Sequence, residues 1–243
     1  MRIFLFALFT FLFIHGKAFS EDIRVLSGGA ARAFVEPLAA SFKGHSIKLE
    51  YQTMGHLVKT MASPDAARYD MVIVTPEVAE KLKLRDVKQL ARVGIGVAVH
   101  EKAPLPDIST PEALRKTLLA AKSVVHINPE TGTSGKYVVE MFRKLDILEQ
   151  MKSKTTLVDS GYAVAPVGRG EVELGIHQIS EILPVKGVRL VGPLPAELQR
   201  YTVYAGAPVP GTAKSGAVLQ FLQYLSSPQA RAGLSKAGYT APE

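Results

Sequence analysis

Short apolar, β-branched runs alternate with amphipathic stretches along most of this chain, and this alternation limits its fold more than any other feature. The strands expected in the first half are residues 23–27, 47–51, 71–74 and 93–99. Between the first two lies a stretch with Phe34, Leu38 and Phe42 at helical spacing. This strand–helix–strand order predicts a parallel sheet with helices on its faces.

A second series follows, in which the expected strands are residues 123–127, 154–158 and 172–176. Extended passages at 93–99 and 201–205 would join the two series, and the helix at 214–225 would pack back on the first. We therefore predict an α/β fold of two lobes, each a mostly parallel sheet flanked by helices, joined by two crossover strands. We expect lobe 1 to comprise residues 21–97 and 203–243, and lobe 2 residues 98–202.

The N-terminal segment has the pattern of an export signal. Arg2 precedes an apolar run over residues 3–14, and Ala18-Phe19-Ser20 ends it with small residues. This predicts a signal peptide over residues 1–20 and a periplasmic mature protein. The alternative is an uncleaved anchor, but the run is shorter than the roughly 20 residues that span a bilayer. We expect no stable membrane insertion after cleavage.

Composition excludes several classes of function. The chain has no Cys, so disulfides and thiolate metal sites are ruled out. Its formal net charge of +7 is spread along the chain, which argues against nucleic-acid binding and favours anionic ligands only weakly. The six His residues show no metal-ligand spacing, so we expect no metal and no cofactor. We expect a monomer.

The turn Ser27-Gly28-Gly29 joins the first expected strand to the first helix. Glycines let the backbone approach a ligand closely, and the free N–H groups of the helix N-terminus favour an anion. The alternative is a plain tight turn. We predict an anion-binding contact here.

The loop at residues 128–135 also precedes a helix, and it offers the hydroxyls of Thr131, Thr133 and Ser134. It is similar to a phosphate-binding loop but lacks two essentials. Glu130 replaces the first Gly, and Tyr137 replaces the residue that would hold magnesium. An anion contact and a simple helix cap both remain open.

Polar residues follow the other expected strands as well. In parallel sheets, ligands bind outside the carboxyl ends of the strands, so these loops would face one cleft. Arg92 and Arg169 are candidate carboxylate clamps, or else surface charges. The candidate ligand contacts are Ser27, Gly28, Gly29, Thr53, Gly55, Thr75, Thr133, Ser134, His177 and Gln178.

The chain resembles the periplasmic molybdate-binding-like solute receptors of ABC transporters, which have the two-lobed type II fold. The segments that carry this resemblance are residues 25–30, 69–73, 107–114, 131–135, 170–175 and 192–195. Oxyanion binders of that family usually have a Ser in the first loop, a Ser pair in the second and a Tyr after the last Gly-Ile strand. Here the second loop reads Thr53-Met54-Gly55 and the last position is His177, which counts against molybdate or tungstate.

The resemblance implies a receptor that captures a small anion, an oxyanion or a di- or tricarboxylate, and presents it to an ABC permease. The subgroup most like this chain also includes aconitate isomerase, an exported enzyme, so double-bond isomerisation is the alternative. That reaction needs a general base and acid. His177 is the first candidate and His56 the second, because an unperturbed His titrates near pH 6.5.

Overall fold

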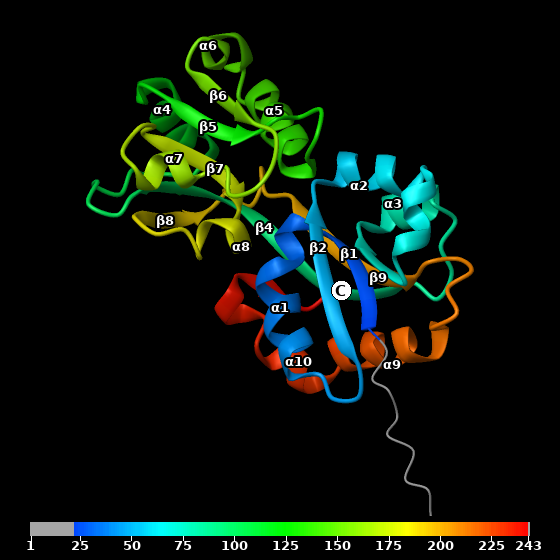
Figure 1. Ribbon diagram of the computed structural model, residues 1–243. Helices are drawn as coiled ribbons and strands as arrows, with labels where there is room; N and C mark the ends of the chain where they lie inside the picture. The colour runs from blue at the N-terminus through cyan, green and yellow to red at the C-terminus, as the bar shows by residue number, and fades with distance from the viewer. Residues whose placement is uncertain (1–21, 243) are drawn as a thin grey trace, which may run out of the picture.

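The computed structural model describes residues 22–242, which form two lobes (Figure 1). The expected signal peptide lies outside the described residues. The first lobe begins with β1 (Asp22–Gly28), the 3₁₀ turn η1 (Gly29–Ala31), α1 (Arg32–Ser41), β2 (Ser46–Gln52), α2 (Met54–Met61), β3 (Met71–Val74) and α3 (Pro76–Lys81). No helix among the described residues is long and apolar enough to cross a membrane.

The sheet of lobe 1 has the strand order β2-β1-β3-β9-β4, with β9 at Tyr201–Pro208 and β4 at Lys88–His100. The first three strands are parallel, and β9 runs antiparallel to both β3 and β4. The strand β3 is apolar and fully buried, whereas β1 is exposed at Asp22 and Arg24 and buried over its second half, and the apolar residues of both strands belong to the core of this lobe. Their carboxyl ends therefore meet at one edge of the sheet.

Lobe 2 repeats this arrangement with the strand order β4-β7-β5-β6 and with β8 paired to β4. The strands β5, β6 and β7 are parallel, while β4 runs antiparallel to β7. The elements of this lobe are α4 (Pro111–Ala120), β5 (Val124–Ile127), α5 (Thr133–Lys144), α6 (Leu148–Lys152), β6 (Thr155–Val158), α7 (Ala165–Gly168), β7 (Leu174–Gln178), α8 (Ile179–Ile182) and β8 (Val188–Pro193).

The long strand β4 belongs to both lobes. It pairs with β9 as far as Gly94, and with β7 and β8 from Ile95 onward. The side-chain amide of Gln199 accepts from the Ile95 N–H at 2.8 Å and donates to its carbonyl at 2.9 Å, which ties the returning passage to β4. Two adjacent passages thus connect the lobes, and the expected bounds of the lobes remain our proposal.

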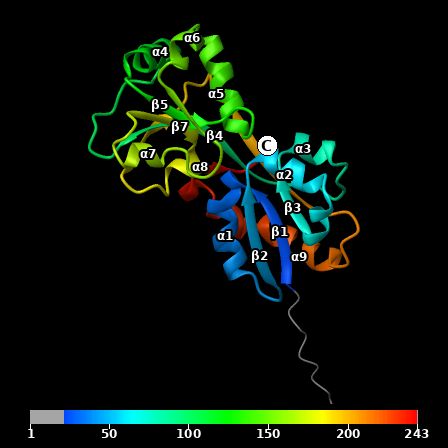
Figure 2. The same cartoon turned by 45° about the horizontal axis from the view of Figure 1, so that its top comes forward.

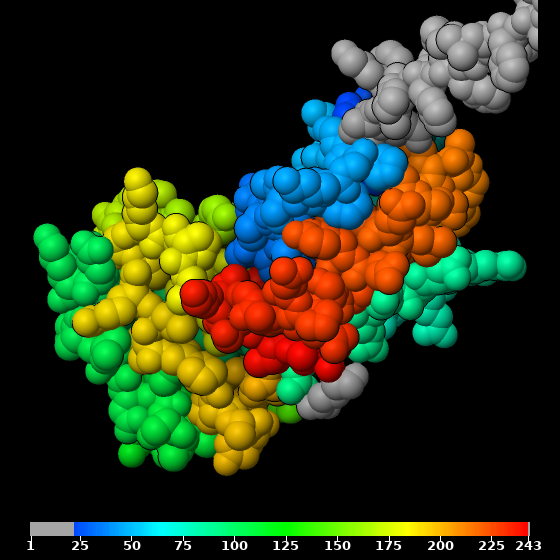
Figure 3. All heavy atoms as spheres, turned by 90° about the horizontal axis from the view of Figure 1, so that it is seen from below, coloured from blue at the N-terminus to red at the C-terminus, as the bar shows by residue number. Residues whose placement is uncertain are grey.

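The C-terminal segment returns to lobe 1. There α9 (Ser215–Leu225) and α10 (Pro228–Ala232) pack beside α1, as the orange and red surface in Figure 3 shows, and β10 (Tyr239–Thr240) pairs with β4. Val218, Phe221 and Leu222 of α9 are buried in the lobe 1 core. This segment closes one face of the lobe 1 sheet.

The structure differs from the sequence-based expectation in three details. The strand β7 starts at Leu174 and continues through Gln178, so His177 lies inside a strand and not in the loop after it. The helix α5 starts at Thr133, three residues before the expected position, because its first turn carries no apolar periodicity. The short elements α6, α8 and β8 were not expected, since four to six residues carry too little pattern to detect.

Candidate functional site

A cavity of about 290 Å³ lies between the lobes, at the carboxyl ends of β1, β2, β5 and β7. Figure 2 shows these strand ends facing each other across the two lobes. Ligand pockets for drug-sized molecules occupy about 300–1,000 Å³, so this cavity suits a small molecule. Its walls are Gly29, Ala30, Arg32, Tyr51, Gln52, Thr53, Met54 and Tyr204 from lobe 1, and Ile127, Gly132, Thr133, Ser134, Ser160, Gly161, Tyr162, His177, Gln178 and Glu181 from lobe 2.

The structure brings together many of the candidate contacts proposed from sequence and leaves the others outside the cavity wall. Those in the wall are Gly29, Thr53, Thr133, Ser134, His177 and Gln178, and those outside it are Ser27, Gly28, Gly55 and Thr75. The two Arg candidates also lie elsewhere. Arg92 donates to Thr240, and Arg169 pairs with Glu171 on the surface.

The residues outside the wall have structural contacts instead. The buried Ser27 hydroxyl donates to the Gly28 carbonyl, and Thr75 caps α3 by accepting from Val78 N–H. A Cβ added at Gly28 would start 2.2 Å from Met54 Cε and 2.9 Å from Tyr204 Cε1, so a larger residue would require both side chains to shift.

Gly55 lies where the two lobes touch. Its N–H donates to the Thr131 carbonyl of lobe 2 at 3.0 Å, and an added Cβ would stand 3.0 Å from that same oxygen. Gly55, which we proposed from sequence as a ligand contact, thus joins the two lobes directly. Glycine permits this backbone-to-backbone approach, and the contact holds the cavity closed on that side.

His56, the second catalytic candidate, is exposed on α2 and does not line the cavity. Its Nδ1 lies 3.1 Å from the Thr53 hydroxyl, three residues earlier at the N-cap of the helix. The side chain that reaches the cavity from this loop is therefore Thr53, and His56 orients its hydroxyl.

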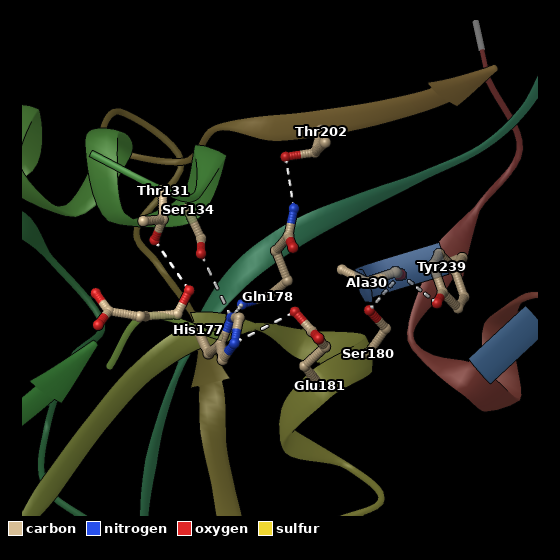
Figure 4. Close-up of polar contacts among 10 residues, drawn as sticks. Ala30, Thr131, Ser134, His177, Gln178, Ser180, Glu181, Thr202 and Tyr239 are labelled. Carbon is tan, nitrogen blue, oxygen red and sulfur yellow. Dashed lines mark hydrogen bonds and ion pairs between the residues drawn. The ribbon is translucent and has the colours of Figure 1, made fainter. Parts of the chain in front are cut away.

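His177 is 1% exposed and sits at the centre of the lobe 2 wall (Figure 4). Its Nδ1 accepts from the Gln178 backbone N–H at 2.8 Å and lies 3.5 Å from the Ser134 hydroxyl. Because Nδ1 accepts, we assign the ring proton of the neutral tautomer to Nε2. Burial lowers the pKa of His177 to about 4, so the ring is neutral at pH 7.

Glu181 lies four residues after His177, in the short helix α8 that follows β7, and it also lines the cavity. Its Oε2 is 3.2 Å from His177 Nε2, in an orientation that makes no hydrogen bond. Burial raises the pKa of Glu181 to about 8, although Arg32 lowers it in part. At pH 7 most of this carboxyl is therefore protonated, and the contact joins two neutral groups rather than an ion pair.

Arg32 supplies the positive charge of the cavity. Its guanidinium lies 4.1 Å from the ring centroid of Tyr51 in lobe 1 and 5.9 Å from that of Tyr162 in lobe 2. The Arg32 Nη1 atom also lies 3.5 Å from Glu36 Oε1 on the surface, and the Arg32 side chain is 40% exposed. Two aromatic faces thus hold a guanidinium that can bind a carboxylate.

The sequence-based list missed Arg32, Tyr51 and Glu181. Arg32 was detectable in principle, because a cation in the first turn of a helix opposes the helix dipole and needs another reason to be there. Glu181 follows an apolar strand by three residues, which was a weaker signal. Tyr51 is part of an ordinary alternating strand, and only the packing of the lobes reveals its position.

Two buried polar atoms of the cavity residues make no hydrogen bond. Among the described residues, the buried side-chain atoms without a hydrogen bond are His45 Nδ1, Tyr51 Oη and His177 Nε2. The last two belong to opposite walls of the cavity. Unpaired buried polar groups are costly, so a polar ligand that satisfies both would stabilise the closed arrangement. No group of three His, Asp or Glu within residues 22–242 could hold a metal ion.

Comparison with known proteins places the chain in a family of bacterial extracellular solute-binding proteins. A family model described as bacterial extracellular solute-binding protein matches residues 23–240. Aconitate isomerase of a Pseudomonas species is 29% identical over 229 residues, covering 89% of this chain and 86% of that protein. The Escherichia coli (strain K12) molybdate-binding protein is 32% identical over 114 residues, covering 46% and 44%.

A solved structure has the same fold as this chain. The periplasmic molybdate-binding protein of Azotobacter vinelandii superposes with a TM-score of 0.76 at 18% identity, covering 91% of this chain and 100% of that one. At this level of identity the likeness establishes the fold alone. The two-lobed type II architecture expected from sequence is confirmed.

Proposed function

The chain belongs to the bacterial extracellular solute-binding protein family, and from this premise we propose that it captures a small polycarboxylate anion in the cavity between its lobes. The observation that carries the proposal is the pair of unpartnered atoms, Tyr51 Oη and His177 Nε2, on opposite walls of that cavity. A ligand with several carboxylate groups can accept from both while a third group pairs with Arg32. Two lobes that share one ligand would then close around it.

The helix α5 supports the same assignment. Its N-cap Gly132 has no side chain to accept from the first N–H groups, and Gly132, Thr133 and Ser134 all line the cavity. Free N–H groups and the positive end of the helix dipole favour an anion. Together with the Arg32 guanidinium they provide donors from both lobes.

Glu181 favours a carboxylate over a tetrahedral oxyanion. Kept protonated by burial, this carboxyl donates one hydrogen bond and still offers an acceptor oxygen. Fully ionised molybdate and sulfate need donors only. A polycarboxylate, which is itself protonated more easily, tolerates a mixed donor and acceptor wall.

We also propose that the protein is exported and works in the periplasm as a monomer. The N-terminal pattern and the family support export. As a receptor it would deliver its ligand to an ABC permease, as the resemblance to such receptors implies. It would need neither a metal nor a cofactor.

Isomerisation of aconitate is the second candidate, and two observations favour it. The relative that matches along most of both chains is an aconitate isomerase. The cavity also holds a carboxyl with a pKa of about 8, near the working pH that acid–base catalysis needs. This reaction would take place on a bound polycarboxylate, so it extends the binding proposal.

A calorimetric screen tests the binding proposal. Purified mature protein is titrated with tricarballylate, citrate and trans-aconitate, and separately with molybdate and sulfate. We expect the carboxylates to bind and the two oxyanions to give no heat. Binding of molybdate or sulfate without any carboxylate would refute the proposal.

A further inference from the structure

Glu181 is the one acidic side chain that is buried among the described residues, at 8% exposed. It lines the cavity, and it accepts no hydrogen bond from His177 although their atoms lie 3.2 Å apart. A Cβ added at Gly29, on the opposite lobe, would lie 3.1 Å from its Oε1. The carboxyl therefore spans the gap between the lobes, where a ligand would be enclosed.

The groups around Glu181 leave it free to change its protonation state. His177 on β7 is neutral, and Tyr204 on β9, Tyr239 on β10 and Tyr162 after β6 all have pKa values raised by burial. Arg32 on α1 is the one charged group that acts on Glu181. Within residues 22–242, no second carboxylate acts on Glu181. This isolation is suited to a group that gives and takes one proton.

We propose that Glu181 is the acid–base residue of the cavity and moves a proton between two carbons of a bound unsaturated polycarboxylate, with His177 as its positioning residue. This inference rests on the proposed binding of polycarboxylates in the same cavity. It replaces His177 as the proton carrier, because Nδ1 of that ring accepts from the Gln178 N–H and Nε2 already carries the ring proton, so neither nitrogen is free to take a proton from carbon. His56 does not line the cavity.

The step is balanced without any co-reactant. The Glu181 carboxylate removes a proton from the methylene carbon, and the electron pair of that C–H bond forms a new C=C bond with the central carbon. The pair of the old double bond is delocalised into the neighbouring carboxylate. Glu181, now a carboxylic acid, returns the proton to the former vinylic carbon. Nothing is oxidised or reduced, and the double bond has moved by one position.

The pKa of Glu181 supports this role, because a value of about 8 keeps both forms populated at neutral pH. Arg32 would hold the carboxylate that gains negative charge during transfer. Glu181 Oε2 lies 3.2 Å from His177 Nε2, so the imidazole ring packs against the carboxyl and limits its orientation. Loss of His177 would therefore change the pH at which Glu181 acts, beyond any effect on stability.

The test compares the wild type with Glu181→Gln, His177→Gln and the control Glu149→Gln, whose side chain is exposed, pairs with Lys152 and lies outside the cavity wall. Binding of the saturated tricarboxylate tricarballylate is measured by calorimetry. Turnover of trans-aconitate is followed by absorbance, and exchange of its methylene protons in D₂O by NMR. We expect Glu181→Gln to bind within about threefold of the wild type but to lose turnover and exchange by about 10²–10⁴-fold.

We expect His177→Gln to retain measurable turnover with a displaced pH optimum, and Glu149→Gln to match the wild type. Unchanged turnover in Glu181→Gln overturns the assignment. A wild type that binds tricarballylate but neither turns over nor exchanges trans-aconitate overturns it too, while the binding proposal stands. A wild type that binds no tricarboxylate refutes the binding proposal, and the inference is refuted with it.

Discussion

The two walls of the cavity differ in the kind of charge they present. Lobe 1 contributes Arg32, a permanent cation that is partly exposed at the start of α1. Lobe 2 contributes His177 and Glu181, whose charges are suppressed by burial. The difference follows from position, because β7 is a central strand covered on both faces and Arg32 lies at the rim. One wall is therefore suited to attract an anion and the other to exchange a proton with it.

Removing the Arg32 cation should have the largest effect on the difference between the two walls. We expect Arg32→Met to weaken polycarboxylate binding by about 1.5–3 kcal/mol, the usual range for a hydrogen bond to a charged group. Calorimetry measures the loss. The matched control is Arg68→Met, an exposed arginine outside the cavity wall, which should bind like the wild type. Equal affinity in both variants would remove Arg32 from the site.

A second test asks whether the two walls must meet. Gly55→Ala places a methyl group 3.0 Å from the Thr131 carbonyl, a backbone atom that cannot move away alone. Overpacking of this kind costs about 1–3 kcal/mol, so ligand affinity should fall by that amount while the separate lobes stay folded. The control is Gly216→Ala in α9, where nothing lies within 4 Å of the added carbon. Unchanged affinity in Gly55→Ala would mean that ligand binding does not need this contact.

The pH dependence of folding stability tests the two titratable groups of the lobe 2 wall, Glu181 and His177. The folded pKa of Glu181, about 8, exceeds its ordinary value of 4.5, so its stabilising effect is complete below pH 4.5 and is lost as the pH rises through 8. The folded pKa of His177, about 4, lies below 6.5, so its contribution is present above pH 6.5 and is lost as the pH falls through 4. Between pH 4.5 and 6.5 the two slopes oppose each other.

Above pH 6.5 only the effect of Glu181 remains. We expect the free energy of unfolding to fall between pH 6.5 and 8 by on the order of 1–2 kcal/mol. Urea denaturation at both pH values measures it, and Glu181→Gln should flatten the slope. If the unfolding free energy of Glu181→Gln falls with pH as steeply as that of the wild type, the titrating group is another residue.

The smallest expected effect concerns the unpartnered hydroxyl of Tyr51. Tyr51→Phe should leave the unfolding free energy of the ligand-free protein equal or slightly higher, because a buried unpaired hydroxyl is removed. It should weaken polycarboxylate binding by about 0.5–1.5 kcal/mol, the net worth of one hydrogen bond. Tyr201→Phe, at a side chain that is 50% exposed, is the control. Loss of stability without loss of affinity would contradict a ligand contact.

Much of the fold was predictable because its signals are local. The buried strands β1, β3 and β5 are short apolar runs, and α4 begins with Thr110 as its cap and Pro111 in its first turn. The antiparallel return of β9 beside β4 was predicted only as an extended passage. Its pairing joins residues more than a hundred positions apart, and no local pattern encodes such a pairing.

The candidate site was predictable in part. Loops such as 27–30 and 131–135 were identified because glycines and hydroxyls follow apolar strands, yet which atom of each loop faces the cavity was not. The Ser27 hydroxyl donates to the Gly28 carbonyl, and the Gly55 N–H donates to the Thr131 carbonyl of the other lobe. A loop's position follows from strand order, whereas the direction of a side chain depends on its neighbours in space.

The amino-acid sequence alone determined two α/β series, the passages between them and the edge of each sheet where polar loops collect, because periodicity and turn residues act over a few positions. Only the tertiary structure decided that the pKa of Glu181 is raised beside a neutral His177, and that Arg32 faces them from the other lobe. Protonation depends on how much water and charge surround a group, and those surroundings are assembled from segments distant in the chain.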